Sequence, residues 1–181
     1  NKRGDRQSHI NQHIASICGS ESSLIVNNNA AAVLLSINTL AANSEVICSR
    51  GQIVEIGGSF RISDIIEKSG AILKEVGTTN RTHLKDYENA ISKNTKLLLW
   101  VHTSNYVVKG YAKEVSLEEI VTLGKKYDIP VMADWGSGTF LSLEEYGVPS
   151  DLPIRNIDEK GPDLVAMSGA KMLGGPQSGV I

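Results

Sequence analysis

Short runs of apolar residues alternate with longer amphipathic stretches along the whole chain. The short runs have the length of buried strands, and the stretches between them repeat their apolar residues with the period of a helix. This alternation is typical of βαβ units, so we predict an α/β fold with a mostly parallel sheet sandwiched by helices. The predicted strands are Leu24–Val26, Val46–Ser49, Ala71–Val76, Leu97–Val101, Pro130–Asp134, Leu164–Met167 and one that begins at Gly179.

The helix predictions use the same pattern together with the residues at the ends of each stretch. Ser116 precedes an apolar repeat with two acidic residues in its first turn and two lysines in its last, and this charge order stabilises a helix. The charged segment Pro149–Gly161 is instead expected to be a surface excursion. The predicted helices are His9–Ile17, Ala30–Ala42, Ile62–Lys68, Leu84–Ile91, Leu117–Tyr127 and Leu141–Tyr146.

Composition narrows the class of protein. The 181 residues suit one domain, or a large part of one, with a real core. A formal net charge of −2 gives no basic signature, so any nucleic-acid contact must come from a local patch or from other parts of the protein. Cys18 and Cys48 have neither a disulfide framework nor the spacing of metal ligands, which favours a reduced cytoplasm. No apolar run approaches the roughly 20 residues of a membrane span.

An aspartate ends one predicted strand, and a lysine follows the next. Asp134 is the last residue of its strand, and Lys171 lies between an apolar strand and the glycine loop 174–175, where we expect it to be shielded from water. Ligands of open α/β sheets bind at the carboxyl ends of strands. A lysine amine there can form a Schiff base with pyridoxal 5'-phosphate (PLP), and an aspartate can keep the pyridine nitrogen protonated. The pair predicts a PLP site. The alternatives are a solvated lysine and an aspartate that caps a helix.

Other residues near the strand ends are candidates for holding the cofactor phosphate. Asn28, Asn29 and Ala30 open a predicted helix, whose free N–H groups and dipole form an anion site. Ser168, three residues before Lys171, is a second candidate contact of the phosphate. The alternatives are ordinary helix capping for the asparagines and a plain turn for the serine.

Two further strand ends carry polar side chains. His102 and Asn105 follow one predicted strand, and Arg50 follows another. His102 is either a cofactor contact or a core histidine, and Asn105 is a candidate donor to the phenolic oxygen of the cofactor. Arg50 is placed to lie over the cofactor ring or to bind a substrate anion. Arg3 and Arg6 bring two guanidinium groups into a predicted loop, which suits phosphate or carboxylate binding.

Several longer motifs have a more specific pattern. They are Lys2–Arg6, Val26–Leu35, Ser49–Arg61, Glu75–Leu84, Val101–Asn105, Gly136–Gly138 and Leu173–Gln177. On these motifs the sequence resembles the bacterial selenocysteine synthases, the L-seryl-tRNA(Sec) selenium transferases. The similarity covers nearly the whole chain, so chance is a poor explanation.

The resemblance implies an aspartate-aminotransferase-like (fold type I) PLP-dependent large domain, with Lys171 as the Schiff-base residue and Asp134 at the pyridine nitrogen. It also places Arg3, Arg6 and Arg50 where the family holds the cofactor region or the anionic selenium donor. Family members convert seryl-tRNA(Sec) through a dehydroalanyl intermediate into selenocysteinyl-tRNA(Sec), with selenophosphate as donor. They form large homo-oligomeric rings with shared active sites. Residues 1–181 are then expected to be an internal piece of a longer protein, without its N-terminal tRNA-binding region and C-terminal small domain.

One position departs from the family pattern. Ala170 precedes Lys171, where the family has aspartate in Ser-Gly-Asp-Lys. A carboxylate beside the reacting amine can transfer a proton or orient a group, so its loss is expected to slow selenium transfer without preventing PLP binding. Two alternatives stay open: a related PLP lyase or aldolase that acts on a small amino acid, and a catalytically silent paralogue. No metal site is predicted.

Overall fold

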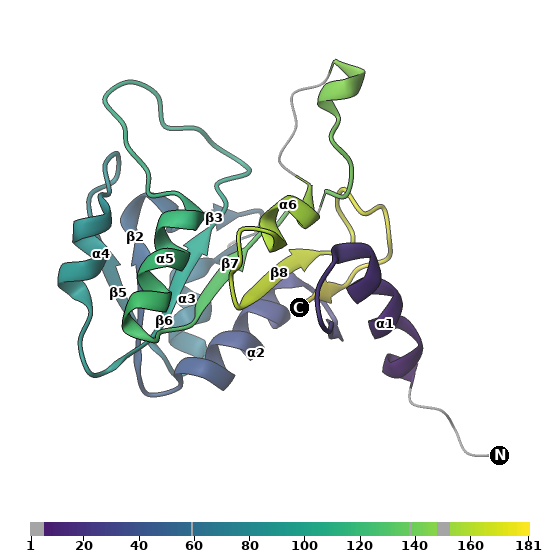
Figure 1. Cartoon of the computed structure of the whole chain (residues 1–181), viewed down its shortest axis with the longest axis horizontal. Helices are drawn as coiled ribbons and strands as arrows, with labels where there is room; N and C mark the ends of the chain where they lie inside the picture. Colours follow the sequence, from purple (N-terminus) through teal and green to yellow (C-terminus); the bar gives the residue numbers. More distant parts are fainter. Residues whose placement is uncertain (1–5, 59, 138, 148–152) are drawn as a thin grey trace.

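The structure is a computed structural model that describes residues 6–58, 60–137, 139–147 and 153–181. The strands of its central sheet are β1 (Ile25–Val26), β2 (Glu45–Ser49), β5 (Ile72–Val76), β6 (Thr95–Val101), β7 (Val131–Asp134), β8 (Leu164–Ser168) and β9 (Gly179–Val180). Their order across the sheet is β1-β9-β8-β7-β6-β2-β5, and Figure 1 labels the strands from β8 to β5. The pairs from β8 to β5 are parallel, whereas β9 runs antiparallel to both of its neighbours. The predicted mostly parallel α/β sheet is confirmed.

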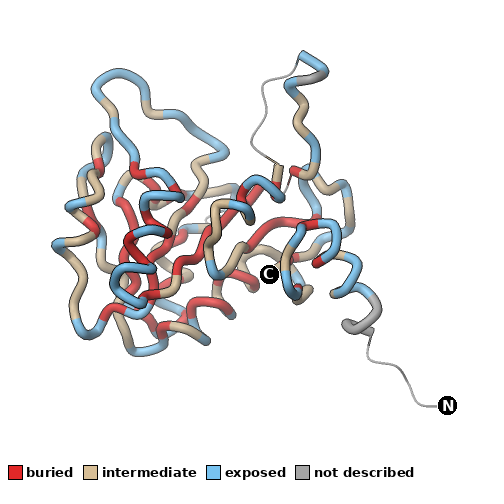
Figure 2. Tube along the Cα trace, viewed as in Figure 1, coloured by how far each residue is buried: buried red, intermediate tan, exposed pale blue. Residues whose placement is uncertain are grey.

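Helices cover both faces of this sheet. They are α1 (Arg6–Cys18), α2 (Asn29–Ala41), α3 (Ile62–Lys68), α4 (Leu84–Ala90), α5 (Leu117–Tyr127) and α6 (Ile154–Asp158). Successive strand residues point to opposite faces. Ile47 therefore belongs to the core cluster that includes residues of α4, α5 and α6, while Val46 and Cys48 belong to the cluster of α2 and α3. The buried strands form the centre of the molecule (Figure 2). None of the described helices has the length and apolar character needed to cross a membrane.

The two helices with the clearest sequence signals have the expected caps. Ser116 accepts a hydrogen bond from the Glu119 backbone N–H, and the Glu119 side chain accepts one from the Ser116 N–H. At α2 the cap is Asn28, whose side chain accepts from the Ala31 N–H at 2.8 Å. Because Asn28 does the capping, the side chain of Asn29 is available for another contact.

Two local predictions are wrong. The segment Leu141–Tyr146 holds only a short 3₁₀ turn, η2 (Glu144–Tyr146). Its Leu141 and Tyr146 side chains are 66% and 74% exposed, so no apolar face is buried that would stabilise a helix. In the segment 149–161, residues 149–152 lie outside the described chain, and the remainder contains α6. Ile154 and Ile157 of α6 are buried in the core, so this part is not a surface excursion.

A small hairpin was not predicted. Strands β3 (Glu55–Ile56) and β4 (Phe60–Arg61) pair in antiparallel fashion, in a separate two-stranded sheet. Each strand has two residues, which is too short for an alternating pattern to stand out in the sequence.

A partly buried network of charged and polar groups ties the opposite, amino edge of the sheet together. Glu45, the first residue of β2, accepts hydrogen bonds from Ser92 Oγ at 2.6 Å, Thr95 Oγ1 at 3.1 Å and Lys74 Nζ at 3.3 Å. The hydrogen bond from Ser92, followed by those from Lys74 and Thr95, holds the pKa of Glu45 below its usual value of 4.5. The Glu45 carboxylate therefore joins β2, β5 and β6 at the amino edge of the sheet. The candidate site lies at the opposite edge, where the strands have their carboxyl ends.

We expect Glu45→Gln to lower the free energy of unfolding by about 1–2 kcal/mol at neutral pH, because hydrogen bonds to a charged acceptor are replaced by weaker ones. A depressed folded-state pKa stabilises the protein above the unfolded pKa, and this contribution is lost as the pH falls through the folded-state pKa. The difference between parent and variant should therefore shrink below a pH of about 4. Chemical denaturation of the full-length parent and variant at neutral and acidic pH measures this difference in the free energy of unfolding.

Glu55→Gln is the matched control. Glu55 forms an ion pair with Arg61 in which both side chains are more than half exposed, so solvent screens the pair and its loss should leave stability nearly unchanged. Equal losses in the two variants would contradict the role assigned to Glu45.

Candidate active site

The parallel strands bring the candidate residues to one edge of the sheet. β7 lies between β6 and β8, with Asp134 in register with Val101 on one side and Ala166 on the other. The carboxyl ends of these strands therefore lie side by side. The loops that follow them carry His102, Trp135 and Lys171 along this edge.

Asp134 is a buried carboxylate with a defined partner. Only 4% of its surface is exposed, and its Oδ1 accepts a hydrogen bond from Asn29 Nδ2 at 2.8 Å. Burial raises the pKa of Asp134 to about 6, against the opposing effects of the Asn29 hydrogen bond and the positive charge of Lys171. Asn29, which the sequence places at the start of a helix, thus reaches across with its side chain to the end of β7.

Lys171 follows β8 on a turn held by backbone hydrogen bonds. The Gly174 N–H donates to the Lys171 carbonyl at 2.9 Å, and the Gly175 N–H donates to the Gly169 carbonyl at 2.9 Å. A further bond, from the Met172 N–H to the Ser137 carbonyl at 3.2 Å, attaches this turn to the segment after β7. Lys171 is exposed, so the expectation that this chain by itself shields it from water is wrong.

The lysine and the aspartate meet around Gly136. A Cβ atom built on Gly136 would lie 3.8 Å from Lys171 Nζ, 3.9 Å from Asn29 Nδ2 and 4.0 Å from Asp134 Oδ1. The missing side chain therefore leaves room among an amine, an amide and a carboxylate. The structure thus brings Lys171 and Asp134 together at one place.

Three buried polar atoms near this space have no hydrogen-bond partner within the described residues. They are Asn29 Oδ1, Trp135 Nε1 and Ser137 Oγ. Buried polar groups in native proteins are nearly always paired, with protein, water or a ligand. Trp135, Gly136 and Ser137 were not predicted as site residues, although their place directly after a strand-end aspartate was a usable signal.

Three aromatic rings pack together at the ends of β6 and β7, on the sheet face that carries α5. The ring centroids of His102 and Trp135 are 4.0 Å apart with an interplanar angle of 25°, and the Trp100 ring lies 5.9 Å from Trp135 and 6.1 Å from His102. The His102 backbone N–H also donates to the Asp134 carbonyl at 3.0 Å. The structure thus brings His102 to the same strand ends as Asp134.

The start of α2 and the end of β8 lie on either side of β9. Gly179 of β9 is in register with Val26 of β1 and Ser168 of β8. A Cβ on Gly179 would overlap the Asn28 carbonyl, so glycine permits α2 to begin close against the sheet. The candidate phosphate contacts, which are Asn28, Asn29, Ala30 and the buried Ser168, are therefore gathered at one place.

Other predicted residues are not brought to Lys171 within this chain. Arg50 follows β2, three strand spacings or roughly 14 Å from β8, and its Nε forms an ion pair with Glu75 at 2.9 Å. Asn105 donates to the Glu55 carbonyl at 3.0 Å, beside the hairpin. Arg6 is the first residue of α1, and Arg3 lies outside the described residues.

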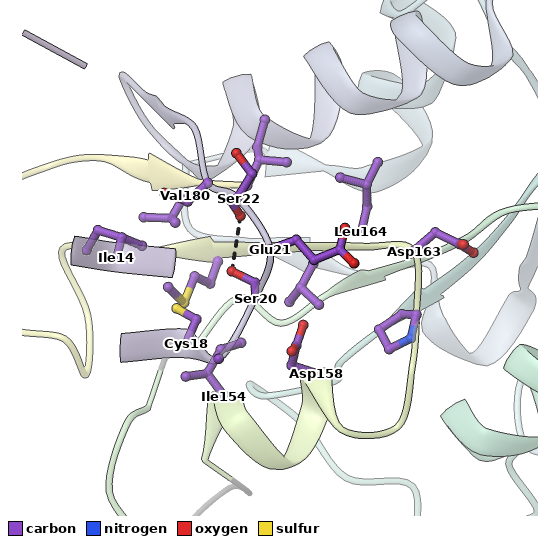
Figure 3. Close-up of a pocket in the computed structure, with 16 residues that line it drawn as sticks. Ile14, Cys18, Ser20, Glu21, Ser22, Ile154, Asp158, Asp163, Leu164 and Val180 are labelled. Atoms are coloured by element: carbon purple, nitrogen blue, oxygen red, sulfur yellow. Dashed lines mark hydrogen bonds between the residues drawn. The ribbon is translucent and has the colours of Figure 1, made fainter. Parts of the chain in front are cut away.

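A cavity of about 500 Å³ lies elsewhere in the molecule. It lies between the end of α1, α6, β8 and β9, and Figure 3 shows Cys18, Asp158, Leu164 and Val180 around it. None of Asn29, Asp134 and Lys171 lines it. The chemically distinctive groups are at the strand ends rather than in this cavity.

Comparison with known families shows to which family the chain belongs. The sequence pattern of SelA, the L-seryl-tRNA selenium transferase family, matches residues 1–181. The chain belongs to this family. A SelA-family L-seryl-tRNA(Sec) selenium transferase of Nitratidesulfovibrio vulgaris is 56% identical over 180 residues, and one of Caldanaerobacter subterraneus is 55% identical over 180 residues. The match covers 99% of this chain but 38% and 39% of those relatives, so the chain spans less than two fifths of their length.

Solved structures agree on the fold of this SelA-family chain. D-Glucosaminate-6-phosphate ammonia-lyase superposes with a TM-score of 0.78 at 22% identity, covering 99% of this chain and 49% of that one. A putative O-acetylhomoserine (thiol)-lyase of Campylobacter jejuni, which contains N'-pyridoxyl-lysine-5'-monophosphate, superposes with a TM-score of 0.66 at 22% identity and covers 94% of this chain and 37% of that one. At this identity the likeness shows the fold alone. It is the predicted aspartate-aminotransferase-like, fold type I arrangement.

Burial of Asp134 gives a stability prediction for this family member. Because the folded-state pKa is about 6 against the usual 3.8, the folded protein binds more protons than the unfolded chain between these values. Stability therefore falls as the pH rises through this window. Asp134→Asn has no such fall, so above pH 6 the ligand-free variant should be more stable by up to about 3 kcal/mol, with the gain disappearing below a pH of about 4.

Denaturation of the ligand-free, full-length protein at several pH values checks this. Asp128→Asn is the control, because Asp128 is exposed at the end of α5 and its left-handed conformation suits asparagine equally well. A gain at Asp134 that does not depend on pH would contradict the prediction.

Proposed function

We propose that this chain is the PLP-binding large domain of an L-seryl-tRNA(Sec) selenium transferase. The full protein would convert seryl-tRNA(Sec) into selenocysteinyl-tRNA(Sec), with selenophosphate as the selenium donor. Membership of the family supports the activity. The single observation that carries the cofactor assignment is the convergence of Lys171, Asp134 and Asn29 around the side-chain-free Gly136.

The residues at the strand ends fit PLP group by group. Lys171 supplies the amine, and the buried Asp134 supplies a carboxylate for a ring N–H. The start of α2 supplies free backbone N–H groups for a phosphate, which is a general property of helix N-termini. Ser137 Oγ and Trp135 Nε1, which have no hydrogen-bond partner in the described part of the chain, are polar atoms that still need partners. PLP supplies an electron sink that stabilises negative charge at the substrate Cα.

Each residue then has a defined task. Lys171 Nζ would hold the cofactor through its aldehyde carbon and take the proton from the Cα of the seryl group. Asp134 would keep a proton on the pyridine nitrogen. His102, whose backbone N–H binds the Asp134 carbonyl at the same strand ends, would contact the cofactor. Asn28, Asn29, Ala30 and Ser168 would surround the phosphate, and Asn105 would donate to the phenolic oxygen of the cofactor.

The arginines fit a site completed by more than one subunit. We infer that Arg3, Arg6 and Arg50 contribute to binding of the anionic selenium donor, because guanidinium groups pair with phosphate-like oxygens. Within this chain Arg50 lies away from Lys171, which supports a homo-oligomer in which one subunit serves the site of its neighbour. With a net charge of −2, this region would leave most of the tRNA contact to other parts of the protein. Charged tRNA is a cytoplasmic substrate, so a cytoplasmic location goes with the proposal.

Ala170 keeps a second candidate function in view. It stands where the family has an aspartate beside the lysine, and the two superposable structures are lyases. A PLP lyase acting on a small amino acid is therefore the alternative activity. The presence of both Lys171 and Asp134 speaks against a catalytically silent paralogue.

Lys171→Ala tests the main proposal. The full-length variant should lose the visible absorbance of covalently bound PLP and the adduct trapped by borohydride, and conversion of seryl-tRNA(Sec) should fall by at least ~10²-fold. Lys96→Ala is the control, because Lys96 is exposed near the amino end of β6, at the edge of the sheet opposite the candidate site. A borohydride-trapped adduct that persists on another lysine in Lys171→Ala would show that the assignment is wrong.

Ala170→Asp separates the two activities. If a carboxylate beside the amine moves a proton during selenium transfer, the variant should convert seryl-tRNA(Sec) about 10²-fold faster with PLP affinity unchanged. Ala170→Asn, of the same size but uncharged, should give no such gain. Rapid conversion by the parent protein would show that the carboxylate is dispensable here. No gain, together with turnover of a free amino acid, would favour the lyase.

A further inference from the structure

The side chain of Asn29 has a role that its position in the sequence does not reveal. Asn29 is the first residue of α2, yet the cap of this helix is made by Asn28. The Asn29 amide instead reaches across to the end of β7, where Nδ2 donates to Asp134 Oδ1 at 2.8 Å. Two residues that are 105 positions apart in the chain are thus joined at the centre of the site.

Charge decides the orientation of this amide. An ionised carboxylate can only accept hydrogen bonds, so the amide must present its nitrogen to Asp134. Its Oδ1 then points elsewhere, and it is buried without a partner within the described residues. The amide therefore holds one oxygen of the carboxylate and keeps a free acceptor of its own in the site.

We propose that Asn29 is a positioning residue that engages Oδ1 of Asp134 and thereby fixes the carboxylate with Oδ2 free for the N–H of a protonated pyridine ring. This inference rests on the proposed PLP function and deepens it. A freely rotating carboxylate would have to be ordered each time the ring binds. A carboxylate already held by an amide is ordered beforehand.

The surroundings of Asp134 leave this task to Asn29. Lys171, on the turn after β8, is the nearby positive charge, and its Nζ is one of the atoms around Gly136. His102, after β6, contacts the Asp134 carbonyl through its backbone N–H and stacks its ring on Trp135. Cys48 of β2 is a buried thiol whose pKa is raised to about 12, mainly by burial and then by Glu75 and Asp134, so it stays neutral.

The Asn29 amide also favours the ionised form of Asp134, which is the form that pairs with a protonated ring nitrogen. Burial pushes the pKa of Asp134 up to about 6, and the Asn29 hydrogen bond is the larger of the two effects that pull it down. Without Asn29 the carboxylate would be ionised less readily and oriented less well. Both changes weaken its pairing with a cationic ring nitrogen.

The test compares two ligands on the full-length protein freed of cofactor. One is PLP, and the other is the analogue in which the ring nitrogen is replaced by C–H. Asn29→Leu and Asn29→Ala should weaken PLP binding roughly tenfold, the effect of losing one hydrogen bond to a charged group. The same variants should change the affinity of the analogue by less than about twofold, because it has no ring N–H for Asp134 to bind. Leucine keeps the approximate shape of asparagine, and alanine suits a helix start without added bulk.

Asn38→Leu is the matched control on the same helix. The Asn38 amide also donates at 2.8 Å, to the Ser69 carbonyl, far from the strand-end site. Its loss removes a comparable hydrogen bond from α2 but should leave the affinities for both ligands unchanged. In an Asp134→Asn background, Asn29→Leu should cause no further loss of PLP affinity.

Equal weakening of both ligands by the Asn29 variants would assign Asn29 a merely structural role and overturn the proposal. Unchanged PLP affinity would overturn it as well. If neither ligand binds the parent protein, the proposed function fails instead. The Asn29–Asp134 pairing is then decided in the ligand-free protein, where Asp134→Asn should stabilise the Asn29→Leu background more than the parent, and an equal gain in both overturns the pairing.

Discussion

The parallel pairing of β7 between β6 and β8 is the constraint on which the site depends. It buries the backbone of Asp134 between two neighbours and brings the ends of three strands to one edge. The same pairing fixes where the following loops start, so Lys171 and His102 are placed relative to Asp134 by sheet register, and the His102 N–H hydrogen bond to the Asp134 carbonyl continues this pairing beyond β6. Loops positioned by a rigid sheet in this way are the usual place for binding groups.

Placing a carboxylate at a buried strand end has an energetic cost. The raised pKa of Asp134 shows that burial outweighs the help it receives from Asn29 and Lys171. Buried atoms on Asn29, Trp135 and Ser137 that find no hydrogen-bond partner among the described residues add to the cost. Residues that destabilise the folded protein in this way are typical of functional sites, because the groups that lower stability are those prepared to interact with a ligand. The stable part of the molecule lies elsewhere, in the two apolar clusters on the sheet faces and in the Glu45 network.

Glycines make the site possible as much as polar residues do. Gly136 leaves space where any other side chain would stand among Lys171, Asn29 and Asp134. Gly179 lets α2 begin against β9, because a Cβ there would overlap the Asn28 carbonyl. Both glycines place backbone and polar groups close together, which is how small residues serve a binding site in an open α/β sheet. Ala170 is the complementary case. It is a small residue at a position where the family resemblance implies a carboxylate.

The sequence by itself determined the class of fold, most element positions and the placement of Lys171 and Asp134 at one edge of the sheet. Strand and helix periods are local properties, and parallel strands necessarily end at one edge, so the strand-end residues could be assigned without coordinates. It could not determine that Asn29 turns its side chain to Asp134, because that contact spans 105 positions and depends on Asn28 taking the capping role. Nor could it determine that Arg50 and Asn105 lie away from Lys171, since the order of strands across the sheet is set by tertiary packing. The burial of Ile154 and Ile157 was also decided by tertiary packing. The charged segment around them contains too few apolar residues to indicate that it joins the core.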